Sequence, residues 1–309
     1  MMKIGVIGLG SIAQKAYLPV MSEIAGVDWV LCTRNQAVLR QLKGKYRFTE
    51  SAETIEKLIA SGIDAAFIHT STESHPAIIE TLLNAGIHVY VDKPVSYYYD
   101  DAKRLTELAQ QKQCIFMTGF NRRYAPMVSA LKQVPERRYI YIEKNRVYLP
   151  DYARRFIFDD FIHVIDTIAY LSPDQVHDVS VSVQAHDGLL LQVMVKLEGE
   201  KYTSVGIMNR DSGITEERME VIGAGKKHTV RNLNTAIHYE DGEEKHKSFG
   251  DWEPVLKRRG FHDMIAHFLN CVSGKEQQYP SMEESLETHR LCELIVKKAE
   301  EQGCIVWKP

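Results

Sequence analysis

The sequence has 309 residues, of which 44% are hydrophobic and 26% charged, with a formal net charge of −3. This balance argues against a protein that binds nucleic acid through its overall charge, and no apolar run reaches the ~20 residues of a membrane span. The length predicts two domains. The five cysteines are odd in number and lack metal-ligand spacing, and the N-terminus lacks a signal-peptide cleavage site. We therefore expect reduced thiols and a cytoplasmic protein.

The first third of the chain alternates β-branched runs with helical patterns, which is typical of βαβ units. The apolar runs are nearly continuous, which indicates parallel strands covered on both faces. Right-handed crossovers between such strands give a doubly wound sheet, so residues 1–122 are predicted to form a dinucleotide-binding Rossmann domain. The predicted strands are 3–9, 27–33, 64–70, 87–92 and 114–120.

Residues 123–309 have a different pattern and predict an α+β domain. A strand at 138–149 and a helix at 158–171 are followed by successive strand-like runs from 176 to 249, separated by turn signals. This succession predicts a large, mainly antiparallel open sheet with one packed face. Two helices close the chain, the second opening with Ser281 and Glu284 at capping-box spacing. We expect this domain to bind substrate and to dimerise, with the last helix returning to the first domain.

A GxGxxA pattern, Gly8-Leu9-Gly10-Ser11-Ile12-Ala13, follows the first predicted strand and opens a helix. The first glycine permits a tight turn, the second lets a pyrophosphate approach the backbone, and Ala13 allows close packing. The alternative is a tight turn with no ligand. The further βα units favour dinucleotide binding, with contacts from Gly8, Gly10, Ser11 and Ile12.

The type of dinucleotide depends on the end of the second predicted strand. NAD-preferring sites usually carry an acid there, whereas this strand ends in Thr33 and Arg34. An arginine at this position can pair with the 2′-phosphate of NADP. The alternative is a surface arginine. The prediction is NADP, with NAD left open.

Charged residues follow the later strands of the predicted sheet. Lys93 stands at the carboxyl end of one strand, and Asn121 and Arg122 follow the next. Ligands bind at this edge of a doubly wound sheet, which favours a site over solvated loop residues.

The helical stretch at 158–171 adds a possible acid–base group. Asp159 and His163 are four residues apart and Asp166 is three further on, so the three share one helix face. An imidazole flanked by carboxylates suits proton transfer. A solvent-facing polar stripe and a metal site are the alternatives, although no further His/Cys cluster completes a metal site.

These stretches together resemble the glucose–fructose oxidoreductase/inositol dehydrogenase (Gfo/Idh/MocA) family, and within it the MviM-like oxidoreductases. The resemblance covers essentially the whole chain and is carried by "GLGSIAQKAYLPV", "LLNAGIHVYVDKP", "GFNRRYAP" and "DDFIHVIDT". In this family the end of the fifth strand carries Glu-Lys-Pro, with a Lys–Pro bond that is often cis. Here it is Asp92-Lys93-Pro94, a departure that shortens the acidic side chain. A second departure is Phe161, where the family often has glycine.

The resemblance implies roles for individual residues. Lys93 would steady the oxygen of the reacting hydroxyl, Asp159 would bind substrate, and His163 would take the hydroxyl proton; Arg122 would also contact substrate. For His75 the alternative is a packing residue at a helix start. For Arg154 and Arg155 a solvated surface position is favoured. Further cofactor contacts would come from Thr70, Ser71, His75, Asp92, Pro94 and Asn121.

The predicted function is therefore an NAD(P)-dependent oxidoreductase that acts on a hydroxyl or carbonyl carbon of a sugar- or polyol-like small molecule. The alternatives are an NADP-binding sensor whose catalytic set is idle, and a reductase of a non-sugar unsaturated metabolite. Nucleic acid, membranes and a bound metal are not expected as partners. The open sheet predicts a homodimer or a dimer of dimers.

Overall fold

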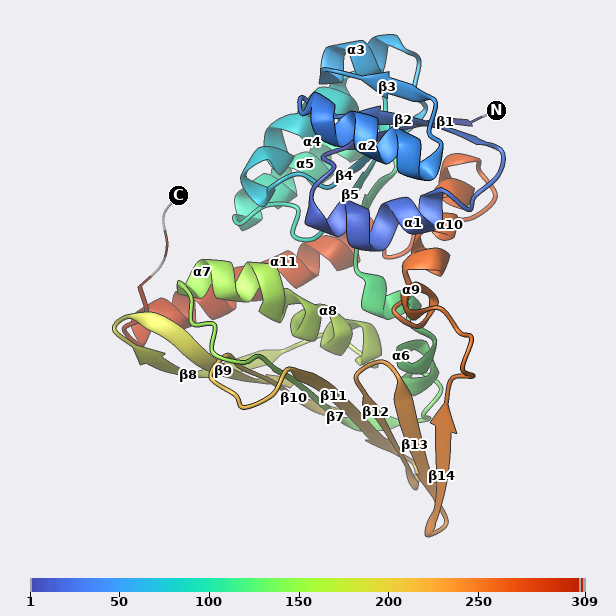
Figure 1. The fold of residues 1–309 in the computed structure, drawn as a ribbon. Helices are drawn as coiled ribbons and strands as arrows, with labels where there is room; N and C mark the ends of the chain where they lie inside the picture. Colours follow the sequence, from blue (N-terminus) through green and yellow to red (C-terminus); the bar gives the residue numbers. More distant parts are fainter. Residues whose placement is uncertain (1, 306, 308–309) are drawn as a thin grey trace. The chain divides into compact units, whose positions relative to one another are not determined.

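The computed structural model describes residues 2–305 and 307. The chain divides into two compact units, coloured by sequence in Figure 1. One comprises Met1–Phe120 and Phe261–Leu286, and the other Asn121–Gly260 and Glu287–Pro309. The predicted boundary after residue 122 lies two residues from this division, and residues 261–286 return to the first unit.

The first unit contains a six-stranded parallel sheet in the order β3-β2-β1-β4-β5-β6. The first three strands extend the sheet to one side of β1, and the next three extend it to the other side, starting with β4. This order confirms the predicted doubly wound Rossmann fold. Strand β3 was not predicted, because Glu50-Ser51-Ala52 contains no apolar run. The strands are β1 (Met2–Ile7), β2 (Val27–Cys32), β3 (Glu50–Ala52), β4 (Ala65–Ile68), β5 (His88–Val91) and β6 (Phe116–Thr118).

Helices cover both faces of this sheet (Figure 1). On one face aliphatic side chains of the strands pack with those of α3, α4 and α5, and on the other Tyr17, Phe67, Tyr90 and Phe268 form an aromatic cluster. Burial of these side chains is the main stabilising contribution. The helices are η1 (Ala13–Tyr17), α1 (Leu18–Met21), α2 (Gln36–Tyr46), α3 (Ile55–Ala60), η2 (Thr72–Ser74), α4 (His75–Asn84), α5 (Tyr99–Gln111) and α10 (Phe261–Val272).

The second unit contains an eight-stranded sheet in the order β14-β13-β12-β11-β7-β10-β9-β8. Its neighbours pair antiparallel except β7 and β10, which are parallel, so the predicted mainly antiparallel sheet is confirmed. The strands are β7 (Arg137–Asn145), β8 (Asp178–His186), β9 (Leu189–Glu198), β10 (Thr203–Asn209), β11 (Glu216–Gly223), β12 (Lys226–Arg231), β13 (Thr235–Glu240) and β14 (Glu243–Ser248).

One face of this sheet is packed by helices, whereas no helix of the described residues lies on the other face (Figure 1). Alternate residues of β10 are buried, as expected for a sheet with a single packed face. Ser281 and Glu284 form the predicted capping box at the start of α11 (Met282–Glu301), which contributes to both units. The other helices of this unit are η3 (Asn121–Tyr124), α6 (Pro126–Leu131), α7 (Ala153–Phe156), η4 (Ile157–Phe161), α8 (Ile162–Leu171) and α9 (Val255–Arg258).

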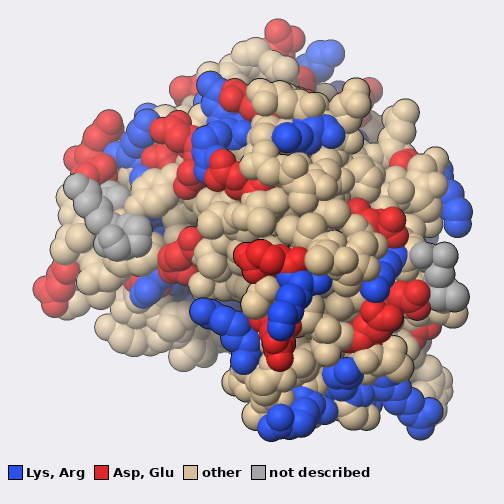
Figure 2. Space-filling model, turned by 90° about the horizontal axis from the view of Figure 1, so that it is seen from above, with Lys and Arg blue, Asp and Glu red and all other residues tan. Residues whose placement is uncertain are grey.

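The thiols agree with the expectation from composition, and charges of both signs share the surface seen in Figure 2. All five cysteines are buried free thiols. Acidic and basic residues are interspersed on the face seen in Figure 2. Among residues 2–305 and 307, no helix combines the length and the apolar character needed to cross a membrane.

Candidate functional site

The glycine-rich turn after β1 lies directly against the end of β4. Gly8 has a φ of 87°, and a Cβ there would come within 2.7 Å of the Thr70 backbone nitrogen. Only glycine fits this conformation and this close approach. A Cβ on Gly10 would meet no atom within 4 Å, so the backbone there borders open space, and Ser11 and Ile12 are exposed. The turn therefore leaves room for a bulky group beside Gly10.

A cavity of about 480 Å³ opens at the carboxyl edge of the six-stranded sheet. It brings together five of the predicted cofactor residues, which come from the ends of three different strands: Gly8, Thr33, Arg34, Thr70 and Ser71. Its remaining wall includes Glu53, Thr54, Ile55 and Glu56, which the sequence analysis missed because β3 was not predicted. Thr54 carried a usable signal, since it caps α3 by accepting a hydrogen bond from the Lys57 backbone N–H.

Arg34 is exposed on the wall of this cavity. The next residue, Asn35, caps α2 by accepting hydrogen bonds from two backbone N–H groups, and its own N–H donates to Thr33 Oγ1 at 3.2 Å. The side chains of Asn35 and Thr33 thus hold the local backbone, and the Arg34 side chain takes no part in these hydrogen bonds. Glu53, which also lines the cavity, forms an ion pair with Lys57 at 2.6 Å.

The Asp92-Lys93-Pro94 stretch follows β5 with a cis Lys93–Pro94 bond, the form expected from the family resemblance. Asp92 Oδ1 accepts a hydrogen bond from the Lys93 backbone N–H at 2.9 Å. Burial raises the pKa of Asp92, and Lys93 opposes this rise. His75 is buried, with Nδ1 2.9 Å from the Pro94 carbonyl and Nε2 3.2 Å from the Thr70 carbonyl. His75 therefore links two loops, as a packing residue at the start of α4 would, and its contact with cofactor stays a prediction.

In the second unit, Asp159 lies on η4, a π-helical turn, and His163 on α8, and both are half-buried. Asp166 is buried and forms an ion pair with Arg123, with oxygen–nitrogen distances of 2.9–3.2 Å. A solvent-facing polar stripe is therefore wrong for Asp166. Lys93 belongs to the first unit, and the roles of Lys93, Asp159 and His163 remain predictions. Among the described residues, no three His, Cys, Asp or Glu side chains gather as metal ligands.

Arg122, the predicted substrate contact, is buried and engaged with Glu217. Its Nε and Nη2 donate to the two Glu217 oxygens at 2.5 and 2.7 Å. Its Nη1 donates to Asn121 Oδ1 at 3.3 Å, and Asn121 Nδ2 donates to the Arg259 carbonyl at 2.9 Å. Two N–H groups of the Arg122 guanidinium that could bind a substrate anion are therefore occupied by Glu217. The contacts of Asn121 with cofactor and of Arg122 with substrate stay predictions.

The expectation of a solvated surface position is wrong for Arg154. It is 7% exposed and makes a bidentate ion pair with Glu293 at 2.7 and 2.8 Å. Arg155 is closer to the expectation, since its side chain is 42% exposed and pairs with Asp151. The error arose because the partner of Arg154 lies 139 residues away in sequence.

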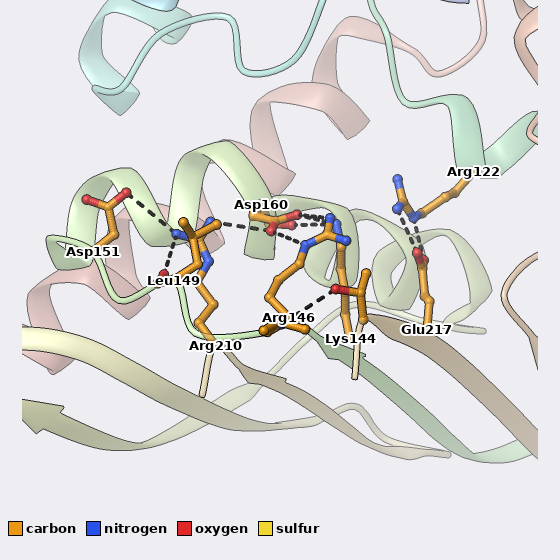
Figure 3. Close-up of polar contacts among 10 residues, drawn as sticks. Arg122, Lys144, Arg146, Leu149, Asp151, Asp160, Arg210 and Glu217 are labelled. Atoms are coloured by element: carbon orange, nitrogen blue, oxygen red, sulfur yellow. Dashed lines mark hydrogen bonds and ion pairs between the residues drawn. The ribbon is translucent and has the colours of Figure 1, made fainter. Parts of the chain in front are cut away.

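A buried network around Asp160 was also missed (Figure 3). Lys144 forms an ion pair with Asp160, and Arg146 Nε and Nη2 donate to the Asp160 carboxylate at 3.0 and 3.1 Å. Arg210 Nη2 adds a contact at 3.3 Å. Burial lowers the pKa of Lys144 to about 7, and Asp160 opposes this fall. The signal for the network was the presence of basic residues in "EKNR" and "MNR" at strand ends.

Comparison with known proteins agrees with this architecture. The model of the GFO_IDH_MocA family, described as an oxidoreductase family with an NAD-binding Rossmann fold, matches residues 2–120, and the YceM-like C-terminal domain matches 126–241. YceM of Salmonella typhimurium, named as an oxidoreductase, is 31% identical over 96% of this chain and 98% of its own length.

Two further relatives differ in how much of the chain they share. The crystal structure of the dehydrogenase MviM from Clostridium difficile is 36% identical, with a TM-score of 0.91 over 96% of this chain and 99% of that one. Myo-inositol 2-dehydrogenase of Thermotoga maritima is 24% identical over 78% of this chain and 80% of its own length. The protein therefore belongs to the Gfo/Idh/MocA family of NAD(P)-dependent oxidoreductases.

Proposed function

We propose that the protein oxidises or reduces a polyhydroxylated small molecule, such as a sugar or an inositol, with NADP as its preferred cofactor. The observation that carries this proposal is the cavity at the carboxyl edge of the six-stranded sheet, whose walls include Gly8, Thr33, Arg34, Thr70 and Ser71. The printed name of the Thermotoga relative, a myo-inositol dehydrogenase, supports the substrate class. Dinucleotides bind at this edge in doubly wound sheets.

The residues present fit such a cofactor. Gly8 lines the cavity, the backbone at Gly10 borders open space, and Thr33, Arg34, Thr70 and Ser71 supply polar groups around the cavity. A nicotinamide cofactor, when bound, supplies the hydride donor or acceptor. Within the protein, His163 takes the hydroxyl proton, Asp159 holds the substrate, and the Lys93 ammonium stabilises the negative charge that develops on the oxygen.

The preference for NADP rests on Arg34. An exposed guanidinium on the cavity wall can bind a 2′-phosphate through charge-assisted hydrogen bonds. The carboxylate of Glu53, which also lines the cavity, is ion-paired with Lys57, and this pairing reduces its repulsion of a phosphate. Thr33 and Arg34 also occupy the position where an acid would otherwise favour NAD.

The test is thermal unfolding of the purified protein with NADPH, NADP, NADH and NAD titrated separately. Saturation at a hundred times Kd adds roughly 2.7 kcal/mol to the free energy of unfolding, which is a readily visible shift. We expect Arg34→Gln to weaken NADP binding about tenfold and to leave NAD binding unchanged. Arg40→Gln, an exposed arginine on α2, is the matched control. Stabilisation by none of the four dinucleotides would exclude the proposed enzyme.

The open face of the eight-stranded sheet supports a further proposal, that two copies of the chain associate through it in a reducing cytoplasm. Unpaired apolar side chains on such a face, among them the exposed Met194 and Ile222, favour burial against a second copy. Light scattering during size-exclusion chromatography would measure the mass. A monomer at micromolar concentration would contradict this association.

A further inference from the structure

Four arginines gather in the second unit although the net charge of the chain is −3. We name Arg122, Arg146, Arg258 and Arg259 the arginine cluster. Burial lowers the pKa of Arg259, and Arg122, Arg146 and Arg258 lower it further by repulsion, while Glu217 opposes this. Hydrogen bonds join two of the four through Asn121, whose Nδ2 donates to the Arg259 carbonyl and whose Oδ1 accepts from Arg122 Nη1.

The backbone holds Arg259 in this place. Helix α9 ends at Arg258, and the chain turns at Gly260, which has a φ of 82°. A Cβ on Gly260 would come within 2.3 Å of the Asn121 carbonyl oxygen, so only glycine allows the turn to pack against η3. The Asn121 side chain completes the contact by donating to the Arg259 carbonyl. Arg259 is therefore fixed beside Arg122 rather than placed there by a mobile loop.

The cluster has more positive charge than its carboxylates neutralise. Glu217 is engaged by Arg122, and Asp160 is shared by Arg146, Lys144 and Arg210. Arg258 donates to the amide oxygen of Asn234, which carries no charge. Within residues 2–305 and 307, the Arg259 guanidinium makes no hydrogen bond and no ion pair, although its side chain is accessible to a ligand.

We propose that Arg259, together with Arg146, binds an anionic group of the substrate, a carboxylate or a phosphate. This inference rests on the proposed function and narrows its substrate class from neutral polyols to sugar acids or sugar phosphates. A guanidinium presents its N–H groups in a planar fork that matches the oxygens of either anion. Arg146 has a side chain 32% exposed, so it can meet a ligand while it holds Asp160, the neighbour of the predicted catalytic Asp159.

The test measures binding by calorimetry, with the full chain at a constant ionic strength of about 0.15 M so that screening is equal throughout. The probes are glucuronate, glucose 6-phosphate and glucose. We expect one of the two anions to bind at least about tenfold more tightly than glucose, which identifies the group as carboxylate or phosphate. Arg259→Gln should remove this difference. Arg138→Gln, an exposed arginine whose side chain is 67% accessible, should keep it.

Binding of neither anion, or equal binding by the Arg259→Gln and Arg138→Gln proteins, would overturn the proposal. Arg146→Gln provides a second variant, with circular dichroism as the check that each protein folds. Turnover with NADP separates this site from the proposed function. If the anion binds through Arg259 but is never oxidised or reduced, the proposed function fails and the anion site stands. If neutral polyols are turned over with NADP and neither anion binds more tightly than glucose, the function stands and the anion site fails.

Discussion

In the first unit the candidate cofactor site is formed largely by backbone, from Gly8 and Gly10 and from strand ends that carry small polar residues. In the second unit, which contains the predicted catalytic His163, charged side chains are buried in pairs such as Arg122 with Glu217 and Arg123 with Asp166. The candidate cofactor site requires open space beside Gly10 and the positive φ of Gly8. The charged region needs both members of every pair, because a buried charge without its partner is strongly destabilising.

The two units also differ in whether a buried titratable group is neutral or charged, as His69 and Glu217 illustrate. His69 in the first unit lies against the Tyr17 ring, and neither of its ring nitrogens has a hydrogen-bond partner in the part of the chain that the structure describes. Burial lowers the pKa of His69 to about 3, so this imidazole is neutral at pH 7. In the second unit Glu217 is buried and ionised. Burial therefore keeps His69 neutral, whereas the ion pair with Arg122 keeps Glu217 charged.

The largest expected effect comes from removing the Lys93 ammonium, which tests whether the cofactor site of the first unit binds its ligand without this charge. We expect Lys93→Met to lower kcat by about 10²–10⁴-fold, because the cation near the reacting oxygen is lost. Cofactor binding, measured by thermal unfolding with NADPH, should be retained. Lys103→Met, with a side chain 53% exposed on α5, is the control. Loss of cofactor binding in Lys93→Met would break the comparison, since the site would then depend on more than backbone.

The second prediction concerns the buried pairs. Glu217→Ala leaves Arg122 buried without its carboxylate and is expected to lower the free energy of unfolding by about 3–5 kcal/mol, measured by urea denaturation. Arg138→Ala removes the exposed pair between Arg138, on β7, and Glu136, and is expected to cost about 0–1 kcal/mol. Equal losses in the two variants would show that the second unit does not depend on buried charge.

The same pair makes a prediction about acid. Against the effect of burial, Arg122 lowers the pKa of Glu217 from 4.5 to about 2. The unfolded chain then binds more protons than the folded one between these values. The stabilisation is present above pH 4.5 and is lost as the pH falls towards 2. Stability measured against pH should therefore fall less steeply over this range in Glu217→Ala than in wild type.

His69 should produce a smaller effect at milder pH in the first unit. Its pKa is lowered from 6.5 to about 3, so the unfolded chain takes up a proton at His69 that the folded chain excludes. Stability should fall as the pH drops from 6.5, by about 2 kcal/mol at pH 5. His69→Leu should remove this part of the slope, measured as melting temperature against pH. An unchanged slope would mean that the buried imidazole is charged or solvated.

The smallest expected effect concerns the capping box at the start of α11. The Ser281 side chain accepts a hydrogen bond from the Glu284 N–H at 3.1 Å, and Ser281→Ala should cost about 1 kcal/mol of stability. Ser273→Ala is the control, because that hydroxyl only donates to a carbonyl at the end of α10. A loss as large as that of Glu217→Ala would indicate that α11 couples the two units more tightly than a cap can explain.

Local patterns were enough to predict most of the first unit. The apolar runs predicted β1, β2, β4, β5 and β6, and the GxGxxA turn predicted the position of Gly8, because each depends on neighbouring residues alone. Strand β3 escaped since three residues without an apolar run carry no periodicity. Because β3 was missed, residues 53–56, which also line the cavity, were missed as well.

By itself, the sequence determined the fold class, the glycine turn and the residue types at the strand ends, because backbone conformation and hydrophobic periodicity are short-range. Only the tertiary structure decided which charges neutralise one another. Arg122 and Glu217 are 95 residues apart, and Arg154 and Glu293 are 139 apart. Coulomb interactions depend on distance in space and on burial, neither of which sequence spacing reports. The same reason explains why the sequence analysis did not identify Arg259, the proposed anion-binding residue.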